Sequence, residues 1–426
     1  MEASSAPTSV WRSRDFKLVM AAGVVNDIGD WMLSLALPVY VFTETGSGRN
    51  TALVFLIDLF VGVTCGAFGG ALADRWNLRR TIIGTNVLQA VTLLPLLFVN
   101  HDRIWLVFVV SALQALLQQV NNPASWALVP RVVSEGQLVQ ANAAFSAGGS
   151  IARLVGAPLG GIAIATGGLD TVVAVDALTF LTIGFAMLFL RAHTDPIPKP
   201  LADDPYEVDE SGVVAGWRLI RTRPVLVGYL VAQSLAQLAF AMFPLVFIKF
   251  VIVKLDGGGT EIGVIRGCAA FGGLVASLLI TKAAQRVNPA YLMMWGYFGF
   301  ALVGWTFINA TFVTTALGVY LVLFALTGIP NATSQIGAQA TAQRWCPPEI
   351  RGRLAGVMSA TGAVGAGIGT IVAGALVDHV NVVALFNGQT TVFFLAGVAT
   401  LFLVVRRLDE ASVTPVPADE SVGSSP

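Results

Sequence analysis

The sequence predicts an all-α membrane protein with twelve transmembrane helices arranged as two six-helix halves. Hydrophobic residues make up 55% of the chain and charged residues only 12%, a balance that argues against a water-soluble fold. Twelve segments are long and apolar enough to cross a bilayer, which takes about 20 helical residues because the backbone must satisfy its own hydrogen bonds. A polar stretch at 191–223 separates six of these segments from the other six.

The expected spans follow one another with mostly short connections, as neighbouring antiparallel helices in a bundle require. The first follows a polar start and is too long for the apolar core of a signal peptide, so we expect it to be retained. In order, the expected spans are 16–42, 51–73, 81–100, 104–128, 139–166, 170–190, 224–253, 261–281, 289–309, 313–340, 352–377 and 382–405.

Four regions follow from this pattern. We expect a first half at 1–190, a linker at 191–223, a second half at 224–410 and a disordered cytoplasmic tail at 411–426. The linker contains DPIPKPLADDPYEVDE, which is rich in proline and acid and is typical of a solvated, disordered loop.

Lys and Arg are distributed unevenly between the two sides of the predicted bundle. If the N-terminus is cytoplasmic, the outer loops carry only Arg49, Arg103 and Lys254, and most of the other basic residues lie on the inner side. Short cytoplasmic loops carry such an excess in membrane proteins. We therefore expect a multi-pass protein of a bacterial-type inner membrane with both termini and the linker in the cytoplasm.

Several classes of function lack support in the sequence. The formal net charge is zero, so nothing indicates a nucleic-acid partner. The three cysteines and three histidines show no metal-ligand spacing, and no GxxxxGK[ST] nucleotide loop or Ser-His-Asp arrangement is present. We expect no metal, no cofactor and no enzymatic activity, and a chain that works as a monomer in the lipid bilayer.

The loop between the second and third expected spans reads GGALADRWNLRRTI. It resembles the loop signature of the major facilitator superfamily, with Asn77 where that family usually has a glycine. Asn tolerates the left-handed turn that a glycine would make there. The resemblance implies a loop that helps to switch between inward-open and outward-open states, whereas the alternative is a set of ordinary cytoplasmic charges. The matching residues are Gly70, Leu72, Asp74, Arg75, Arg79 and Arg80.

The fifth expected span contains GAPLGG, which resembles the glycine-proline signature of the antiporter branch of that superfamily. Gly156, Pro158, Gly160 and Gly161 would let helices approach closely and bend, and generic helix packing is the alternative. Together with GDW in the first span and VDALTF in the sixth, the pattern is most similar to the enterobactin-exporter and macrolide-efflux branch.

Ionisable residues at membrane depth are candidates for proton coupling. Asp27 and Asp30 share one face of the first span, and Arg153 lies at a comparable depth in the fifth. Asp30 and Arg153 could form a buried structural pair, which would leave Asp27 as the better proton carrier. Arg153 also ends a polar stripe of Asn142, Ser146, Ser150 and Arg153, which we expect to face the bundle interior or a watery cavity.

Amide side chains recur at helical spacing in three other spans. The resemblance implies that the first, fourth, seventh and tenth spans line the central cavity, and hydrogen bonding between helices is the alternative for each stripe. The candidates are Gln114, Gln118, Asn121, Gln233, Gln237, Asn331, Gln335 and Gln339.

Three further charged residues are expected near the outer surface. Asp58 and Asp176 lie only a few residues in from the outer ends of their spans, where a structural role is as plausible as a functional one. Arg266 is expected to snorkel to the surface and to pair with Glu261.

These residues favour a secondary active transporter that exports an amphiphilic small molecule, such as a drug, macrolide or siderophore. The expected cavity is amide-lined, aromatic and neutral, and protons moving down their gradient are the expected energy source. A lipid or lysolipid flippase on the same fold is one alternative. A membrane receptor or sensor that does not transport is another.

Overall fold

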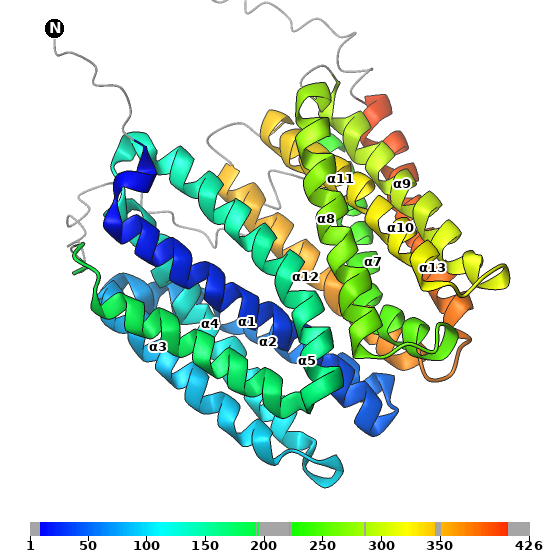
Figure 1. The fold of residues 1–426 in the computed structure, drawn as a ribbon. Coiled ribbons are helices and arrows are strands. Elements are labelled where there is room, and N and C mark those ends of the chain that lie inside the picture. The colour runs from blue at the N-terminus through cyan, green and yellow to red at the C-terminus, as the bar shows by residue number, and fades with distance from the viewer. Residues whose placement is uncertain are drawn as a thin grey trace, which may run out of the picture.

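The computed structural model describes residues 9–192, 194–195, 221, 224–284, 287–345 and 351–407, with the side chains of 67–75, 135, 139, 277–284, 343, 345 and 351–355 excepted. The described secondary structure is helical throughout (Figure 1). The first half contains α1 (Arg14–Thr45), α2 (Gly48–Arg75), α3 (Leu78–Leu93), α4 (Trp105–Val132) and α5 (Leu138–Leu188). The second half contains α7 (Pro224–Lys254), α8 (Gly259–Ala284), α9 (Pro289–Asn309), α10 (Leu317–Leu326), α11 (Gly328–Trp345), α12 (Arg351–Leu376) and α13 (Val382–Thr400).

Short helical pieces extend two of these helices. A 3-10 turn at Leu94–Phe98 continues α3, and a π-helical turn at Leu401–Val405 continues α13. The predicted linker and tail lie almost entirely outside the described residues, so their boundaries stay predictions.

The helix ends follow local sequence signals. The Ser13 hydroxyl accepts a hydrogen bond from the Phe16 amide and caps α1. Gly46 ends α1 with a left-handed φ of 61°, a conformation that costs glycine little, and Ser47 then caps α2. A two-residue connection thus reverses the chain between the first two spans.

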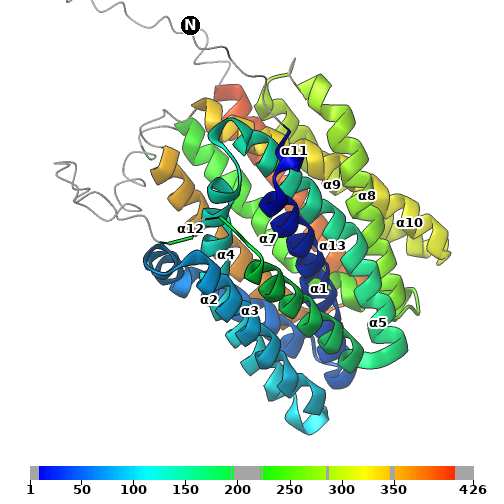
Figure 2. The same ribbon diagram turned by 60° about the vertical axis from the view of Figure 1, so that its left-hand side comes forward.

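The fifth and sixth expected spans form one continuous helical stretch that is folded at Gly168. Gly168 has φ 69° and ψ −172°, which only a glycine adopts readily. Figure 2 shows the second arm of α5 running back along the bundle, where it packs against α3. The reversal therefore needs a single non-helical residue and no loop.

The tenth expected span is divided into α10 and α11 at Thr327. Pro330 follows the break and lacks the amide hydrogen that would bond back to the preceding turn. Gly328 crosses α8 so closely that an added Cβ would lie 2.1 Å from the Gly273 nitrogen. The break therefore lies where the span crosses its neighbour.

Nine described stretches are long and apolar enough to cross a membrane by length and composition. One of them, Gln140–Leu188, is the stretch folded at Gly168 and provides two passes. With α4 and α8, which that criterion does not select among the described residues, the described helices supply the twelve spans that the sequence predicts.

The two halves meet through matching helix pairs, α5 with α8 and α2 with α12. A Cβ on Gly161 would lie 2.2 Å from the Gly259 carbonyl oxygen, so only glycine fits this crossing. The Gly48 amide donates to both carboxylate oxygens of Asp378 at 2.9 Å, which joins the start of α2 to the end of α12. Both contacts lie at the end of the molecule away from the N-terminus, and the ribbons spread apart toward the other end (Figure 1).

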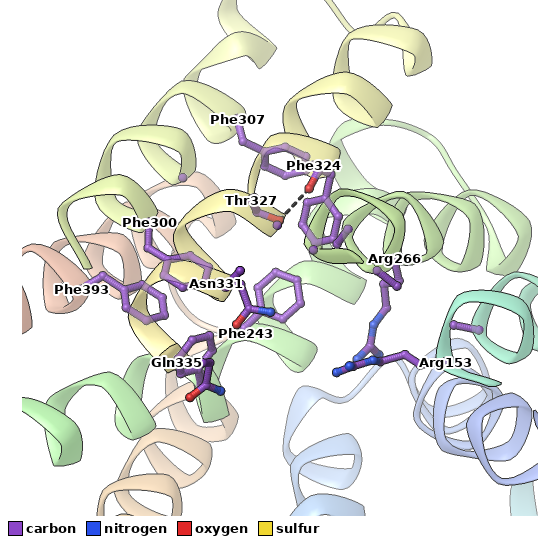
Figure 3. Close-up of a pocket in the computed structure, with 18 of the residues that line it drawn as sticks. Arg153, Phe243, Arg266, Phe300, Phe307, Phe324, Thr327, Asn331, Gln335 and Phe393 are labelled. Atoms are coloured by element: carbon purple, nitrogen blue, oxygen red, sulfur yellow. Dashed lines mark hydrogen bonds between the residues drawn. The ribbon is translucent and has the colours of Figure 1, made fainter. Parts of the chain in front are cut away.

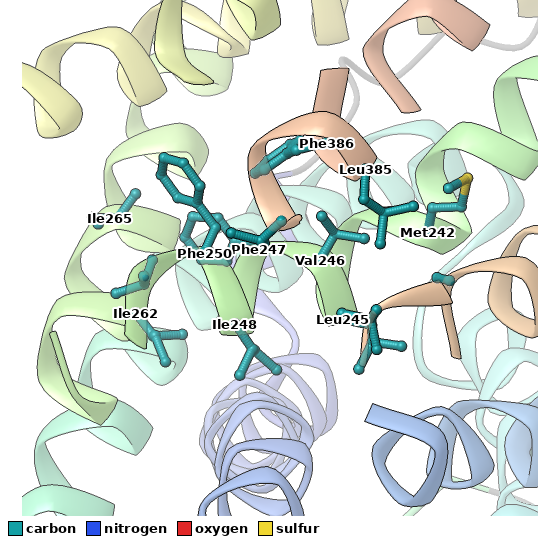
Figure 4. Close-up of a cluster of buried hydrophobic side chains, with 14 of the residues drawn as sticks. Met242, Leu245, Val246, Phe247, Ile248, Phe250, Ile262, Ile265, Leu385 and Phe386 are labelled. Carbon is teal, nitrogen blue, oxygen red and sulfur yellow. The ribbon is translucent and has the colours of Figure 1, made fainter. Parts of the chain in front are cut away.

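A buried hydrophobic cluster reinforces the closed end. Phe247 and Phe250 of α7 pack there with Ile265 of α8 and Phe386 of α13 (Figure 4). The cluster also includes Leu35 and other residues of α1, so it crosses between the halves. This end of the bundle is therefore sealed by apolar side chains.

Candidate functional site

A cavity of about 500 Å³ lies between the two halves and is called the interhalf cavity here. The first half contributes Trp31 from α1 together with Ser150, Arg153 and Ala157 from α5. The second half contributes an aromatic wall from α7, α9, α10 and α13, and amides from α11. The aromatic residues are Phe240, Phe243, Phe300, Phe307, Phe324, Phe386 and Phe393.

Two arginines line this cavity, one from each half. Arg153 projects from α5 and Arg266 from α8, and Figure 3 shows both side chains directed into the cavity across from the phenylalanines. The Arg153 guanidinium carbon lies 5.6 Å from the centre of the Trp31 ring, within cation–π range. No Asp or Glu is among the lining residues, so the described cavity is cationic.

This arrangement corrects two expectations. Arg266 does not reach the surface to pair with Glu261, whose carboxylate instead accepts the Gly258 amide at 2.7 Å. The cavity is aromatic as expected, but the two arginines make it positively charged and not neutral. Arg266 lies on the α8 face that packs against the first half, a property that its distance from the helix end does not reveal.

A second cavity, of about 420 Å³, lies within the first half and is called the acidic cavity here. Asp27 and Asp30 of α1 line it, and the Asn26 amide donates to the Asp30 carboxylate at 3.1 Å. Its other polar lining residues are Gln89, Gln118, Asn121, Asn122, Ser125, Asn142 and Ser146. Lys and Arg are absent from the described lining.

Asp176 lies next to this cavity behind α1 and is fully buried. Gly29 allows the approach, because a Cβ there would lie 2.4 Å from an Asp176 carboxylate oxygen. One Asp176 oxygen accepts from the Thr179 hydroxyl at 3.2 Å, and the other has no hydrogen-bond partner. Asp30 is within electrostatic range of both Asp27 and Asp176, so three carboxylates gather here.

Counting residues from the outer surface did not identify Asp176 as part of this group. Gly29 and the VDALT segment at 175–179 could have suggested it only with knowledge of which helices pack together.

Helix α1 forms a wall of both cavities. Asp30 faces the acidic cavity, whereas the next residue, Trp31, faces the interhalf cavity. The polar stripe of α5 is divided in the same way. Asn142 and Ser146 line the acidic cavity, and Ser150 and Arg153 line the interhalf cavity. A polar path on α5 thus runs from one cavity to the other.

The structure does not pair Asp30 with Arg153. Arg14 with Asp15, at 3.9 Å, is the only ion pair among the described residues. Gly156 explains the separation, since a Cβ there would lie 2.7 Å from the Ile28 carbonyl oxygen and from Trp31 Cβ. The Arg153 region of α5 therefore packs on the Ile28 and Trp31 face of α1, about 100° around the helix from Asp30.

The amide candidates occupy different places. Gln118 and Asn121 line the acidic cavity, and Asn331 and Gln335 line the interhalf cavity. Helix α4 therefore contributes to the acidic cavity and not to the interhalf cavity.

The remaining amides lie elsewhere. Gln114 is hydrogen-bonded to α3, because its side-chain amide donates to the Gln89 carbonyl at 2.9 Å and to the Thr92 hydroxyl at 3.1 Å. Gln233 accepts from the Tyr297 hydroxyl at 2.9 Å and lines a separate recess with Gln237. Gln339 is exposed and lines none of the described cavities. Gln114 and Gln233 therefore form the hydrogen bonds between helices that were the alternative. Asn121 does so as well, since its side-chain oxygen accepts from Thr85 at 2.9 Å and from Asn86 at 3.0 Å on α3.

The glycine-proline segment of α5 has two contact faces. Gly156 and Gly160 pack on α1, and a Cβ on Gly160 would lie 2.7 Å from the Met32 backbone. Pro158 and Gly161 face α8, where a Cβ on Gly267 would lie 2.5 Å from the proline ring. One segment therefore fixes α5 to its own half and also forms the crossing to the other half.

The cytoplasmic loop is described only in part. The side chains of Gly70, Asp74 and Arg75 lie outside the described residues. Arg79 donates to the carbonyls of Leu188 and Leu190, so it caps the end of α5 within its own half. The Arg80 amide donates to the side chain of Asn77 at 3.1 Å.

Asn77 corrects an expectation for this loop. Its φ of −64° and ψ of 118° are extended, not left-handed, and it serves as the N-cap of α3. An N-cap needs a side-chain acceptor and an extended backbone, and Asn supplies both.

Comparison with known proteins adds to this geometry. The family model described as Major Facilitator Superfamily matches residues 19–255 and 230–424. The multidrug efflux pump Tap of Mycolicibacterium fortuitum is 25% identical over 409 residues, with 93% of this chain and 97% of that protein covered. The enterobactin exporter EntS of Shigella boydii is 24% identical over 402 residues, with 92% of each covered. A crystal structure of a bacterial homologue of the iron transporter ferroportin, in an inward-facing state, has the same fold, with a TM-score of 0.71, 14% identity and coverage of 91% and 98%.

Proposed function

The chain belongs to the Major Facilitator Superfamily, and on this premise we propose that it is a proton-coupled exporter of an amphiphilic small molecule. The observation that carries the proposal is the shared wall of the two cavities. On α1, Asp30 lines the acidic cavity and Trp31 lines the interhalf cavity. A change in the protonation of the acidic cavity therefore acts on a helix that also forms the substrate cavity.

The similar proteins support export as the direction. Tap is described as a multidrug efflux pump and EntS as an enterobactin exporter, and both match nearly the whole chain. The phenylalanine wall suits the apolar body of such a compound, since small-molecule sites are mostly apolar with a few polar groups that fix orientation.

The acidic cavity supplies the proton site. Asp27, Asp30 and Asp176 lie close together without a described cation, and carboxylates at membrane depth are candidates for proton relays. Asp27 lines the cavity and has no described hydrogen-bond partner, so it is the proposed proton carrier. A proton would bind there from one side of the membrane and leave toward the other.

Alternating access is the proposed route for the substrate. The described halves touch at the end of the bundle away from the N-terminus. The interhalf cavity lies between those contacts and the end of the bundle where the N-terminus is. The α5–α8 crossing is built from Gly161, Gly259 and Gly263, which present backbone and no interlocking side chains. Such a smooth contact can separate while each half stays intact.

The proposed orientation places both termini in the cytoplasm, so the open end in this structure would face inward. A single cysteine at Ser47, between α1 and α2, should react with an impermeant reagent in intact cells. One at Asp204, in the expected linker, should react only after permeabilisation. Labelling of Asp204 in intact cells would reverse the orientation.

Transport by the reconstituted protein tests the function. A pH gradient would be imposed across the membrane of proteoliposomes. Uptake of a macrolide, a catecholate siderophore and a dansyl-labelled amphiphile would be measured with and without this gradient. We expect gradient-dependent accumulation of at least one compound, abolished by a protonophore. Accumulation of none would contradict the proposal, and binding without transport would favour a receptor.

One observation favours a lysolipid flippase as the second candidate. A recess of about 590 Å³ lies between α2 and α12 and is lined by small residues such as Gly62, Gly66, Gly356 and Ala363. A recess of that size between two helices has room for a lipid chain. Movement of a fluorescent lysophospholipid between leaflets, with no transport of the water-soluble compounds, would establish this alternative.

A further inference from the structure

Arg153 and Arg266 lack partners for most of their hydrogen-bonding groups. Each guanidinium carries five N–H donors, yet neither has a described hydrogen bond or ion pair. Arg266 is partly buried, whereas Arg153 is exposed and has the Trp31 ring beside it. The Arg266 charge is partly removed from water without a counter-charge, which is costly, and the exposed Arg153 lies close enough to share an anion with it.

The positions of the two arginines are fixed by the helix crossing beside them. A Cβ on Gly263 would lie 2.6 Å from the Ala157 carbonyl oxygen, and one on Gly267 would lie 2.5 Å from the Pro158 ring. Arg153 is one turn before Ala157, and Arg266 directly precedes Gly267. The two cations therefore project from positions beside close contacts of the α5–α8 interface.

The two charges act on each other across the halves. Arg153 is the charged neighbour whose positive charge repels that of Arg266. Figure 3 shows both guanidinium groups on the same side of the cavity, directed toward each other. No carboxylate of the described lining separates them. An anion between them would relieve their repulsion and could form paired N–H···O bonds with either guanidinium.

The wall across from the arginines has a different character. The seven phenylalanines named above supply apolar and π surfaces, and Asn331 and Gln335 add amide groups at its edge. A ligand that fills the cavity would place an acidic group at the arginines and an apolar or aromatic body against the phenylalanines.

We infer that Arg153 and Arg266 together bind the acidic group of the substrate, which is an amphiphilic anion carrying a carboxylate or phosphate. The inference rests on the proposed function in treating the interhalf cavity as the substrate site, and it narrows the substrate class. An anion held by one arginine from each half also links the halves, so its binding favours the arrangement in which α5 and α8 are packed together.

Binding of a matched pair of probes tests the inference. Dansylglycine carries a carboxylate, and dansylglycinamide has the same skeleton without the charge. Their dissociation constants would be measured by fluorescence with the full-length protein in nanodiscs. We expect the carboxylate to bind at least about tenfold more tightly than the amide, because hydrogen bonds to charged groups contribute that much to affinity.

The variants Arg153→Met and Arg266→Met should each remove this preference while leaving the affinity for the amide unchanged. Arg344→Met is the control, because Arg344 is exposed near the end of α11 and lines no described cavity. Equal affinity of the wild type for both probes, or a full preference in both methionine variants, would overturn the inference.

A second pair of variants covers the case in which the methionine variants do not fold. Arg153→Lys and Arg266→Lys keep the charge but lose the planar fork of N–H donors. They should weaken carboxylate binding and spare the amide. Unchanged carboxylate affinity in both would also overturn the inference.

Two further experiments identify the molecule that carries the acidic group and distinguish a failure of the anion inference from a failure of the proposed proton-coupled transport. Displacement of dansylglycine by lysophosphatidylglycerol, but not by lysophosphatidylcholine, would assign the acidic group to a lipid headgroup. No displacement by either would assign it to a soluble acid. In proteoliposomes, equal transport of carboxylate and amide would contradict only the anion inference, whereas gradient-independent movement of both would contradict the proposed proton coupling.

Discussion

The acidic cavity and the interhalf cavity share α1 as a wall, yet the charges of their linings are opposite. The acidic cavity has Asp27 and Asp30 and no described cation, and the interhalf cavity has Arg153 and Arg266 and no described acid. A structural ion pair would have combined these charges in one place. Their separation suggests that each set is available to a mobile partner, a proton for the acids and an anionic substrate for the arginines.

Packing keeps the two sets of charges apart. Gly156 and Gly160 let the first arm of α5 lie directly on α1, and Gly29 lets the second arm of α5 approach a different side of the same helix. Asp30 and Trp31 therefore point into different cavities although they are neighbours in the sequence. Small residues on α1 and α5 decide which cavity each charged residue enters.

The largest expected effect concerns the acidic cavity alone. Asp27→Asn mimics the protonated carboxyl, so gradient-driven transport should fall to the level seen without a gradient, while the dissociation constant of dansylglycine changes less than about twofold. Uptake by proteoliposomes and equilibrium binding measure the two properties. Asp58→Asn is the control, because Asp58 lies on α2 outside both cavities. Full coupling in Asp27→Asn would remove this residue as the proton site.

The next effect concerns the interhalf cavity alone. Trp31→Ala removes the ring beside the exposed Arg153 and should weaken carboxylate binding by about two- to fivefold, the range of an exposed cation–π contact. Trp126→Ala is the matched control, because Trp126 lines the acidic cavity. Equal losses of affinity in the two variants would show that the cavities do not act separately.

A smaller effect is expected on stability. Asp176 is buried with one oxygen unsatisfied and lies near other carboxylates, so Asp176→Asn should raise the free energy of unfolding by about 1 kcal/mol. Thr179→Val should have the opposite sign, because it removes a hydrogen bond that Asp176 accepts. Unfolding in increasing SDS measures both. A lower stability of Asp176→Asn would mean that a cation or another donor holds this carboxylate.

The smallest effect separates a structural amide from a cavity amide. Gln114→Leu breaks its bonds to α3 and should cost about 0.6 kcal/mol of unfolding free energy, a typical value for hydrogen bonds between membrane helices, with transport retained. Gln118→Leu, one turn later on α4, should change gradient-driven transport more than stability because Gln118 lines the acidic cavity. A transport defect in Gln114→Leu together with a loss of stability in Gln118→Leu would contradict this assignment.

The number of spans could be predicted from the sequence because bilayer thickness fixes the length of an apolar helix. Two features of the spans were not apparent from hydropathy. The fold at Gly168 replaces a loop by one glycine, and the tenth span is divided at Thr327. Both depend on the local backbone and on neighbouring helices.

The functional residues were harder to place because a sequence gives the depth of a side chain but not the direction in which it points. Depth made Asp30 and Arg153 plausible partners, but they lie on different sides of α1. Depth made Arg266 a surface residue, but its helix face turns it into the interhalf cavity. The stripe from Asn142 to Arg153 was easier to recognise, since several polar residues on one face restrict the rotation of the helix.

The most direct test of separate proton and anion sites is a crossed measurement on Asp27→Asn and Arg153→Met. Gradient-driven uptake and the binding preference for dansylglycine over its amide would be measured for each variant and for the wild type. We expect Asp27→Asn to lose the gradient response and keep the preference. Arg153→Met should keep the gradient response, measured with the amide, and lose the preference. Loss of both properties in either variant would contradict the account, because one cavity would then serve both functions.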